Sequence, residues 1–176
     1  MPNPGTGGVF DPTRDYLLTG NIQLAGAGSA IQQYGINASP GTTYVLPVSQ
    51  SGQTFLFDRA AGVTYTLPNL SSSTQGLNYT FVVTTSVTSN NHKIITYTGS
   101  GGTNLLIGST WSTVAAGTGT QFFANNSTHV AVTMNGTTTG GLINTVLYFV
   151  QISATQWLVD GTVEGSGTIA TSFATS

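Results

Sequence analysis

The segment Asn78-Tyr79-Thr80-Phe81-Val82-Val83-Thr84 carries the clearest structural signal in this chain, because its side chains alternate between two faces. One face receives Tyr79, Phe81 and Val83, and the other receives Thr80, Val82 and Thr84. Residues 129–135 alternate in the same way. A period of two is typical of a half-buried β-strand, so both segments are predicted to be strands.

Short segments of this kind, bounded by turn residues, recur along most of the chain. Further strands are expected over residues 42–46, 54–57, 63–67, 93–98, 104–107 and 121–124. No stretch has helical periodicity, and the helix formers Glu, Lys and Arg are nearly absent. The sequence therefore predicts an all-β protein, with a β-sandwich or jelly-roll-like domain or a trimeric β-prism as the candidate architectures.

Residues 142–152 differ from the other predicted strands, because they are apolar on both faces from Val146 onward. Leu147 and Phe149 fall on one face, while Tyr148 and Val150 fall on the other. Such a strand is expected in the middle of a sheet that is covered on both sides. The second cover is either another sheet or a neighbouring subunit.

Two local patterns predict turns. Thr43-Tyr44-Val45-Leu46-Pro47 is echoed by Thr64-Tyr65-Thr66-Leu67-Pro68, and the simplest interpretation is two strands that each end at a proline-led turn. Two copies fall short of the three units that a solenoid usually needs. Asn135-Gly136 and Asp160-Gly161 are dipeptides that favour tight β-hairpin turns.

Charge is scarce throughout the chain, with three Lys or Arg and five Asp or Glu among 176 residues. Three cations cannot neutralise many phosphates, so the composition argues against nucleic-acid binding and against attachment to anionic lipid. No apolar run approaches the roughly 20 residues of a membrane-spanning helix. The surface is expected to be neutral, and a weakly charged surface favours association with other proteins.

The N-terminal residues differ from the rest of the chain in composition. Residues 1–40 are rich in Pro and Gly and are predicted to be an extended arm, followed by a sandwich domain over residues 41–176. The arm either packs against a partner or is a frayed terminus. The opening residues lack the features of a secretory signal, so synthesis in a cytoplasm is expected. The chain has no cysteine, which excludes disulfides and thiolate metal sites.

The residues that could support catalysis are few. His92 and His129 have no second histidine or carboxylate at a metal-binding spacing, and Asp160 and Glu164 flank a predicted turn. Asp58 is expected to cap a turn or to form a local ion pair. We therefore predict no enzymatic activity and no cofactor or metal.

The two tryptophans lie in different sequence contexts. Trp157 alternates with Val159, which predicts packing in the core or in an interface. Trp111 is placed in a loop and is the better candidate for an outer contact, including the stacking of a sugar ring on an exposed aromatic.

A longer pattern resembles one found in virion proteins of tailed bacteriophages. Residues 51–68 combine Ser-Gly-Gln-Thr, an apolar strand, Asp58 and a Thr-Tyr-Thr-Leu-Pro ending, and residues 76–83 and 89–95 resemble the strands that follow. Near the C-terminus, residues 156–161 and 172–175 are similar to the closing strands of those proteins. The resemblance covers residues 49–176 in outline and does not extend to the arm.

This resemblance implies a structural role on the outside of a phage capsid, as a decoration (cement) or head-fibre protein that is often trimeric. The implied partners are the major capsid protein and further copies of this chain. The candidate contact residues are Asp11, Arg14, Tyr16, Trp111, Leu147 and Phe149. The alternative function is a head- or tail-fibre domain that binds cell-surface glycans.

Overall fold

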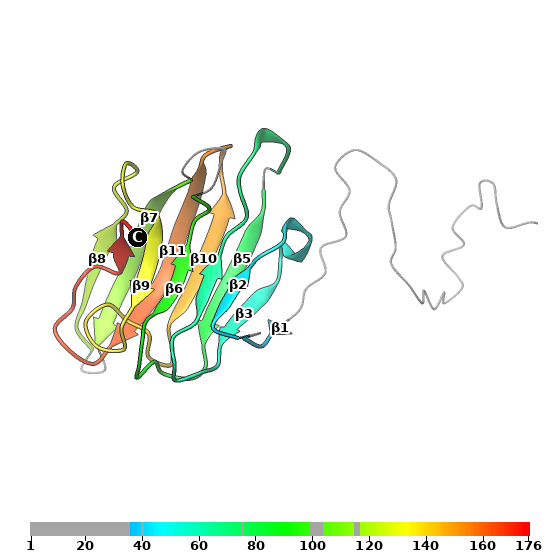
Figure 1. Cartoon of the computed structure of the whole chain (residues 1–176). Helices are drawn as coiled ribbons and strands as arrows, with labels where there is room; N and C mark the ends of the chain where they lie inside the picture. The colour runs from blue at the N-terminus through cyan, green and yellow to red at the C-terminus, as the bar shows by residue number, and fades with distance from the viewer. Residues whose placement is uncertain (1–35, 40, 75, 99–103, 115–116) are drawn as a thin grey trace, which may run out of the picture. The chain divides into compact units, whose positions relative to one another are not determined.

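The computed structural model describes residues 36–39, 41–74, 76–98, 104–114 and 117–176. These residues form twelve strands in two sheets, together with two single-turn 3-10 helices, η1 (Val48–Gln50) and η2 (Ser72–Thr74) (Figure 1). The chain is all-β, as the sequence predicts. No helix within these ranges has the length and apolar character needed to cross a membrane.

One sheet has seven strands, in the order β1-β3-β5-β10-β11-β7-β8, and the other has five, in the order β12-β9-β6-β4-β2. The strands of the seven-stranded sheet are β1 (Ile36–Asn37), β3 (Thr54–Phe57), β5 (Asn78–Val83), β7 (Leu105–Val114), β8 (Gly119–Phe123), β10 (Val146–Gln151) and β11 (Gln156–Gly165). Those of the five-stranded sheet are β2 (Thr43–Val45), β4 (Thr64–Thr66), β6 (His92–Ile95), β9 (Ala131–Met134) and β12 (Phe173–Ala174).

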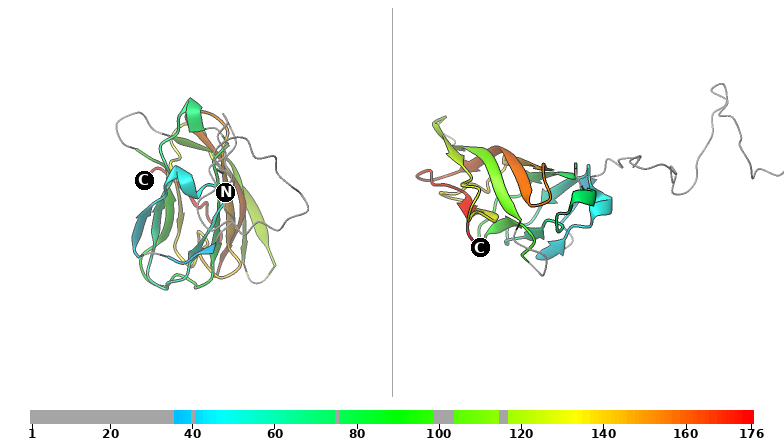
Figure 2. Two further views of the ribbon diagram at one scale, coloured as in Figure 1. Left: turned by 90° about the vertical axis from the view of Figure 1, so that its right-hand side faces the viewer. Right: turned by 90° about the horizontal axis from the view of Figure 1, so that it is seen from above.

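The first six strands form a stack of parallel coils. The chain passes alternately from the seven-stranded sheet to the five-stranded sheet, so β1 and β2, β3 and β4, and β5 and β6 are the two sides of three successive turns (Figures 1 and 2). β1 pairs in parallel with β3 and β3 with β5, while β2 pairs in parallel with β4 and β4 with β6. This is the arrangement of a short β-solenoid, whereas a jelly roll is antiparallel.

The sequence echo marks two neighbouring coils of this stack. Tyr44 lies opposite Tyr65, and Tyr65 lies opposite Ile94 in the next strand. The two Thr-Tyr segments are therefore adjacent parallel strands, and Lys93-Ile94-Ile95 is the third member, which the echo does not reveal because its side chains differ. The echo consists of two strands that each end just before a Leu-Pro pair, as the sequence predicts, and these two strands are also neighbours in the sheet.

The remaining strands are mainly antiparallel. β10 pairs with β11 and β5, and β9 pairs with β6, so these strands extend both sheets beyond the coils. Asp160-Gly161 is not a turn, because both residues lie within β11. At Gly161 the neighbouring strand approaches so closely that an added Cβ would lie 2.2 Å from the carbonyl oxygen of Val146.

Asn135-Gly136 is a turn, although not a two-residue hairpin. The side-chain oxygen of Asn135 accepts hydrogen bonds from the backbone N–H groups of Thr137, Thr138 and Thr139. Gly136 has a φ of 79°, which a glycine adopts without strain. The strands on either side, β9 and β10, belong to different sheets.

The two sheets enclose one aromatic core. The ring of Tyr65 on the five-stranded sheet lies 5.6 Å from Phe55, 5.1 Å from Phe57 and 5.4 Å from Phe81, which all come from the seven-stranded sheet. Trp157 is fully buried at the other side of this cluster, 5.8 Å from Tyr79. The prediction that Trp157 packs in the core is confirmed.

Candidate functional site

Each of the two histidines is held by a hydrogen bond from a backbone N–H and by contact with a phenylalanine ring. The buried His92 ring accepts a hydrogen bond at Nδ1 from the backbone N–H of Val63 and lies 4.5 Å from the ring of Phe57. Burial lowers its pKa, because the charged form would lose its hydration. His129 accepts a hydrogen bond from the N–H of Asn125 and stacks on Phe173. Both rings stabilise local structure.

The carboxylates that flank Gly161 are not a catalytic pair. Asp160 and Glu164 are four residues apart in one strand, which separates them by roughly 13 Å. Glu164 accepts a hydrogen bond from the side-chain amide of Asn144. Asp58 accepts hydrogen bonds from the backbone N–H of Ser39 with both carboxylate oxygens, so it contacts a segment nineteen residues earlier in the chain. Among the residues that the structure describes, no three His, Asp or Glu side chains are grouped as metal ligands.

The most distinctive surface is the outer face of the seven-stranded sheet, which points away from the core. Along β10, Leu147, Phe149 and Gln151 point inward, so Tyr148 and Val150 point outward. The strand pairing continues this surface sideways, because Val150 lies opposite Leu158 and Leu158 lies opposite Ile107. The large exposed hydrophobic side chains of this face are Ile36, Trp111, Phe123, Tyr148, Val150, Ile152 and Leu158. The exposed Asp160 lies opposite Tyr148 on the same face.

Trp111 and Phe123 occupy the edge of this face, on the hairpin formed by β7 and β8. Trp111 is 49% exposed and Phe123 is 67% exposed. The indole of Trp111 lies over Gly119 so closely that a Cβ on this glycine would meet Nε1 at 2.6 Å. Between the two aromatics, the amide of Gln121 donates a hydrogen bond to the hydroxyl of Ser109. The hairpin thus presents two aromatic rings beside neutral polar groups.

The outer face of the five-stranded sheet has a different chemistry. Thr43, Thr64 and Lys93 lie side by side on its three parallel strands. A shallow depression nearby is lined by Thr42, Gly62, Thr64, Asn90, Asn91 and Lys93. The seven-stranded sheet therefore carries most of the exposed aromatic side chains, whereas the outer face of the five-stranded sheet combines threonines and Lys93 with the exposed Val45.

Of the six predicted contact residues, three lie within the part of the chain that the structure describes. Asp11, Arg14 and Tyr16 lie outside the described residues, as does most of the predicted arm. Trp111 is exposed as predicted, although it lies in the strand β7 and not in a loop. Leu147 and Phe149 require correction: they are 1% and 0% exposed in the core of this same chain, so they are not available to a partner.

The residues that sequence reasoning missed are the outward members of the same strands. The apolar character of residues 146–150 on both faces indicated a covered strand, but it could not show which face meets the core. The structure places Leu147 and Phe149 against Phe81 and leaves Tyr148 and Val150 outside. Phe123 and Leu158 carried no signal in the sequence, because their exposure depends on how the strands pair.

Comparisons with protein-family models, with curated proteins and with solved structures found no match to this chain.

Proposed function

We propose that this chain is a structural virion protein that decorates and stabilises the outer surface of a phage capsid through protein–protein contacts. The observation that supports this most directly is the apolar outer face of the seven-stranded sheet. Trp111 and Tyr148 are each 49% exposed, Phe123 is 67% exposed, and Ile36, Val150, Ile152 and Leu158 are exposed beside them on the same sheet. Exposed apolar side chains gathered on one face of a protein mark interaction sites.

Decoration of a capsid requires contacts between proteins and no catalytic chemistry. A protein that binds an assembled shell and not its free subunits stabilises the shell by mass action. The proposed partners are the major capsid protein and further copies of this chain, with a trimer as the proposed oligomer. The protein would be made in the host cytoplasm and would act on the capsid exterior. The link to a phage capsid depends on the sequence resemblance.

The test is binding to capsids and self-association of the full chain, compared with the double variant Tyr148→Asp/Leu158→Asp. Two charges on the apolar face should weaken association at least ten-fold, because charged groups are costly to bury in a contact. A Thr64→Asp/Thr66→Asp double variant on the opposite sheet is the matched control and should bind normally. A monomeric wild-type chain that does not bind capsids would contradict the proposal.

A second candidate, glycan binding, is favoured by the hairpin of β7 and β8. The indole of Trp111 is held over Gly119 and is half exposed, next to the hydrogen-bonding side chains of Gln121 and Ser109. Sugars bind such platforms by stacking on the ring and by neutral hydrogen bonds. Binding to a glycan array that Trp111→Ala abolishes and Trp111→Phe partly retains would favour this function over capsid decoration.

A further inference from the structure

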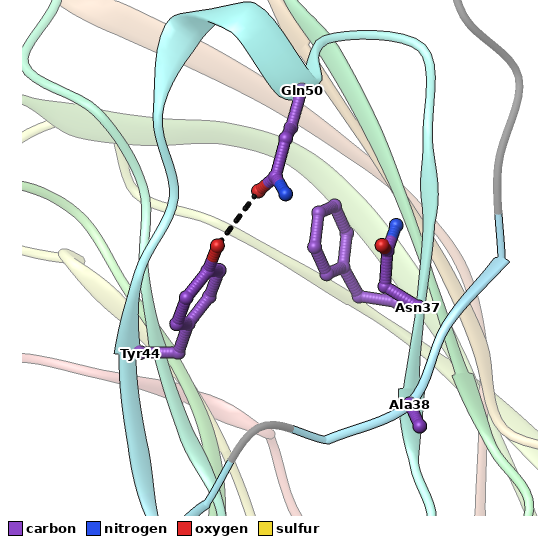
Figure 3. Close-up of a pocket in the computed structure, with 5 residues that line it drawn as sticks. Asn37, Ala38, Tyr44 and Gln50 are labelled. Carbon is purple, nitrogen blue, oxygen red and sulfur yellow. Dashed lines mark hydrogen bonds between the residues drawn. The ribbon is translucent and has the colours of Figure 1, made fainter.

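The seven-stranded sheet ends at β1 on one side and at β8 on the other, and the two ends differ (Figure 1). At the first end, β1 is only two residues long, and a cavity of about 240 Å³ opens beside it (Figure 3). The cavity is lined by Asn37, Ala38, Tyr44, Gln50 and Phe55, and the hydroxyl of Tyr44 donates a hydrogen bond to Gln50. At the second end, β8 is a strand of five residues with no buried side chain. β8 is therefore the longer of the two end strands.

The backbone of β8 is available for pairing along this edge. In the part of the chain that the structure describes, its one neighbour is β7. The N–H of Ala124 donates a hydrogen bond to the carbonyl of Gly108 on the β7 side. Because backbone direction alternates along an antiparallel strand, the residues that point their N–H and C=O groups away from β7 are Gly119, Gln121 and Phe123. The edge therefore offers three N–H and three C=O groups to a further strand.

The sequence of β8 contains none of the features that usually keep a sheet edge unpaired, which are charges, prolines and bulges. Residues 94–159 contain no Lys, Arg, Asp or Glu, and residues 117–124 contain no proline. The pairing of β8 with β7 is continuous from Gly119 to Phe123, without a bulge. A neutral, regular edge of this kind does not repel a second copy of itself.

The edge is also self-complementary in its hydrogen bonding. Two antiparallel strands related by a two-fold axis present the same residues to each other. With Gln121 on the axis, Gly119 of one copy would lie opposite Phe123 of the other, because each is two residues from Gln121. All three residues have outward-pointing backbone groups, so each N–H of the edge would meet a C=O of the second copy.

The side chains on the outer face fit the same pairing. The indole of Trp111 lies over Gly119, so closely that an added Cβ would meet Nε1 at 2.6 Å. Phe123 is 67% exposed on the same face, two residues from the axis. Opposite Gly119 of a second copy, its ring would lie beside Trp111 of that copy, and an aromatic side chain across from an edge glycine stabilises a pair of strands. The pairing would therefore cover two exposed aromatic side chains.

From the backbone edge, its lack of charge and this match of side chains, we propose that two copies of the chain pair through β8, antiparallel about a two-fold axis at Gln121. The two seven-stranded sheets become one continuous sheet. A strand of five residues makes a smaller contact than a permanent dimer has, so the pair dissociates readily. A two-fold contact joins copies in pairs, so it links the proposed trimers to one another and does not form them. The contact involves only this chain and is independent of capsid binding.

Disulfide cross-linking tests the pairing, because the chain has no cysteine of its own. In Gln121→Cys, the two introduced thiols face each other at the axis, at a separation that a disulfide can bridge. Thr120→Cys is the matched control, because Thr120 is also exposed but its side chain points to the other face and lies away from the axis.

Under mild oxidation of the full chain, Gln121→Cys should form a disulfide-linked dimer roughly ten-fold faster than Thr120→Cys, as measured on a non-reducing gel. Equal rates would overturn the proposal. The absence of a dimer in Gln121→Cys would also overturn it and would leave the edge to a strand of another protein.

Opposite charges at the axis provide a second test. Gln121→Lys and Gln121→Glu each place two like charges directly opposite each other, so each variant alone should form lighter particles than the wild type. An equimolar mixture places a lysine opposite a glutamate and should restore the wild-type mass. Sedimentation velocity measures these masses. A wild type that stays monomeric at every concentration, or a mixture that stays as light as its components, would contradict the pairing.

Tyr148→Asp/Leu158→Asp distinguishes this inference from the proposed function. These residues lie on β10 and β11, and β7 separates both strands from β8. With this double variant added, Gln121→Cys should lose capsid binding and still form the cross-link. A cross-link that disappears together with capsid binding would show that the copies meet through the apolar face, and would overturn the pairing through β8.

Discussion

The coiled half of the domain, β1 to β6, and the hairpin half, β7 to β12, bury the same kind of core by different routes. In the coiled half, each strand pairs with a strand that lies one coil away in the sequence, always in parallel. In the hairpin half, β10 and β11 pair directly across a four-residue connection, and β7 pairs with β8 in the same way. The comparison shows that period-two patterning identifies strands in both halves but does not determine how they pair.

The largest expected effect tests whether the two halves are one cooperative unit. Tyr65→Ala should lower the free energy of unfolding by about 4 kcal/mol, because it removes a buried ring at the centre of the aromatic core. It also leaves the carbonyl of Leu56 without the 2.7 Å hydrogen bond that the tyrosine hydroxyl donates. Chemical denaturation followed by circular dichroism measures this loss.

The hairpin half supplies the matched comparison. Trp157→Ala should cost a similar amount, since Trp157 is equally buried in the same cluster. Tyr148→Ala, at an outward position, should cost less than about 1 kcal/mol. Each variant should unfold in a single transition. Two separate transitions, with Tyr65→Ala affecting only one, would show that the halves fold independently.

A smaller effect is expected at Gly62, where two neighbouring coils lie close together. Gly62 precedes β4, and a Cβ at this position would lie 2.3 Å from the backbone oxygen of Asn91. Gly62→Ala should therefore destabilise the protein by about 2 kcal/mol, because backbone atoms of both segments must move apart. The thermal unfolding midpoint reports this change.

Gly167→Ala in the hairpin half is the control for this substitution. The nearest atom to a Cβ at Gly167 is 3.8 Å away, which is an ordinary contact. This variant should be neutral or slightly stabilising, because alanine reduces the freedom of the unfolded chain. If both glycine variants lowered the midpoint equally, the close approach at Gly62 would not be the cause.

The positions of the strands could be predicted from the sequence because alternation is a local property. Residues 54–57 were predicted as a strand and match β3, and residues 78–84 match β5 to within one residue. Asp160-Gly161 was misassigned because the same dipeptide suits a tight turn and a close strand contact, and only the neighbouring strand distinguishes them. Trp111 was placed in a loop because Gly108 interrupts the pattern, although β7 continues through this glycine with a φ of 98°.

The candidate surface could be predicted only in part. Its strand β10 was identified from residues that are apolar on both faces. The choice of outward face depends on contacts with β5 and β11 from distant parts of the sequence. The stack of coils was hidden for a similar reason, since the third coil carries Ile94 where the other two carry tyrosine.

The smallest expected effect is a loss of stability at acid pH, which we expect to come from His92 in the coiled half. His92 in the coiled half is buried and neutral, and burial lowers its pKa below the ordinary value of 6.5. The unfolded chain therefore binds a proton that the folded chain excludes, so the free energy of unfolding should be constant above about pH 6.5 and should fall as the pH drops below it. The slope cannot exceed about 1.4 kcal/mol per pH unit for one proton. Denaturant titrations between pH 7.5 and pH 5 measure it.

His92→Gln should flatten this slope, although it will also lower stability at neutral pH because glutamine fills the site beside Phe57 less well. The comparison is therefore between slopes and not between absolute stabilities. His129→Gln changes the histidine of the hairpin half, beside Phe173, and leaves the buried site of His92 in place, so this variant should keep the acid-induced loss of the wild type. A slope that disappears in His129→Gln and persists in His92→Gln would assign the acid sensitivity to the hairpin half and would contradict the burial argument.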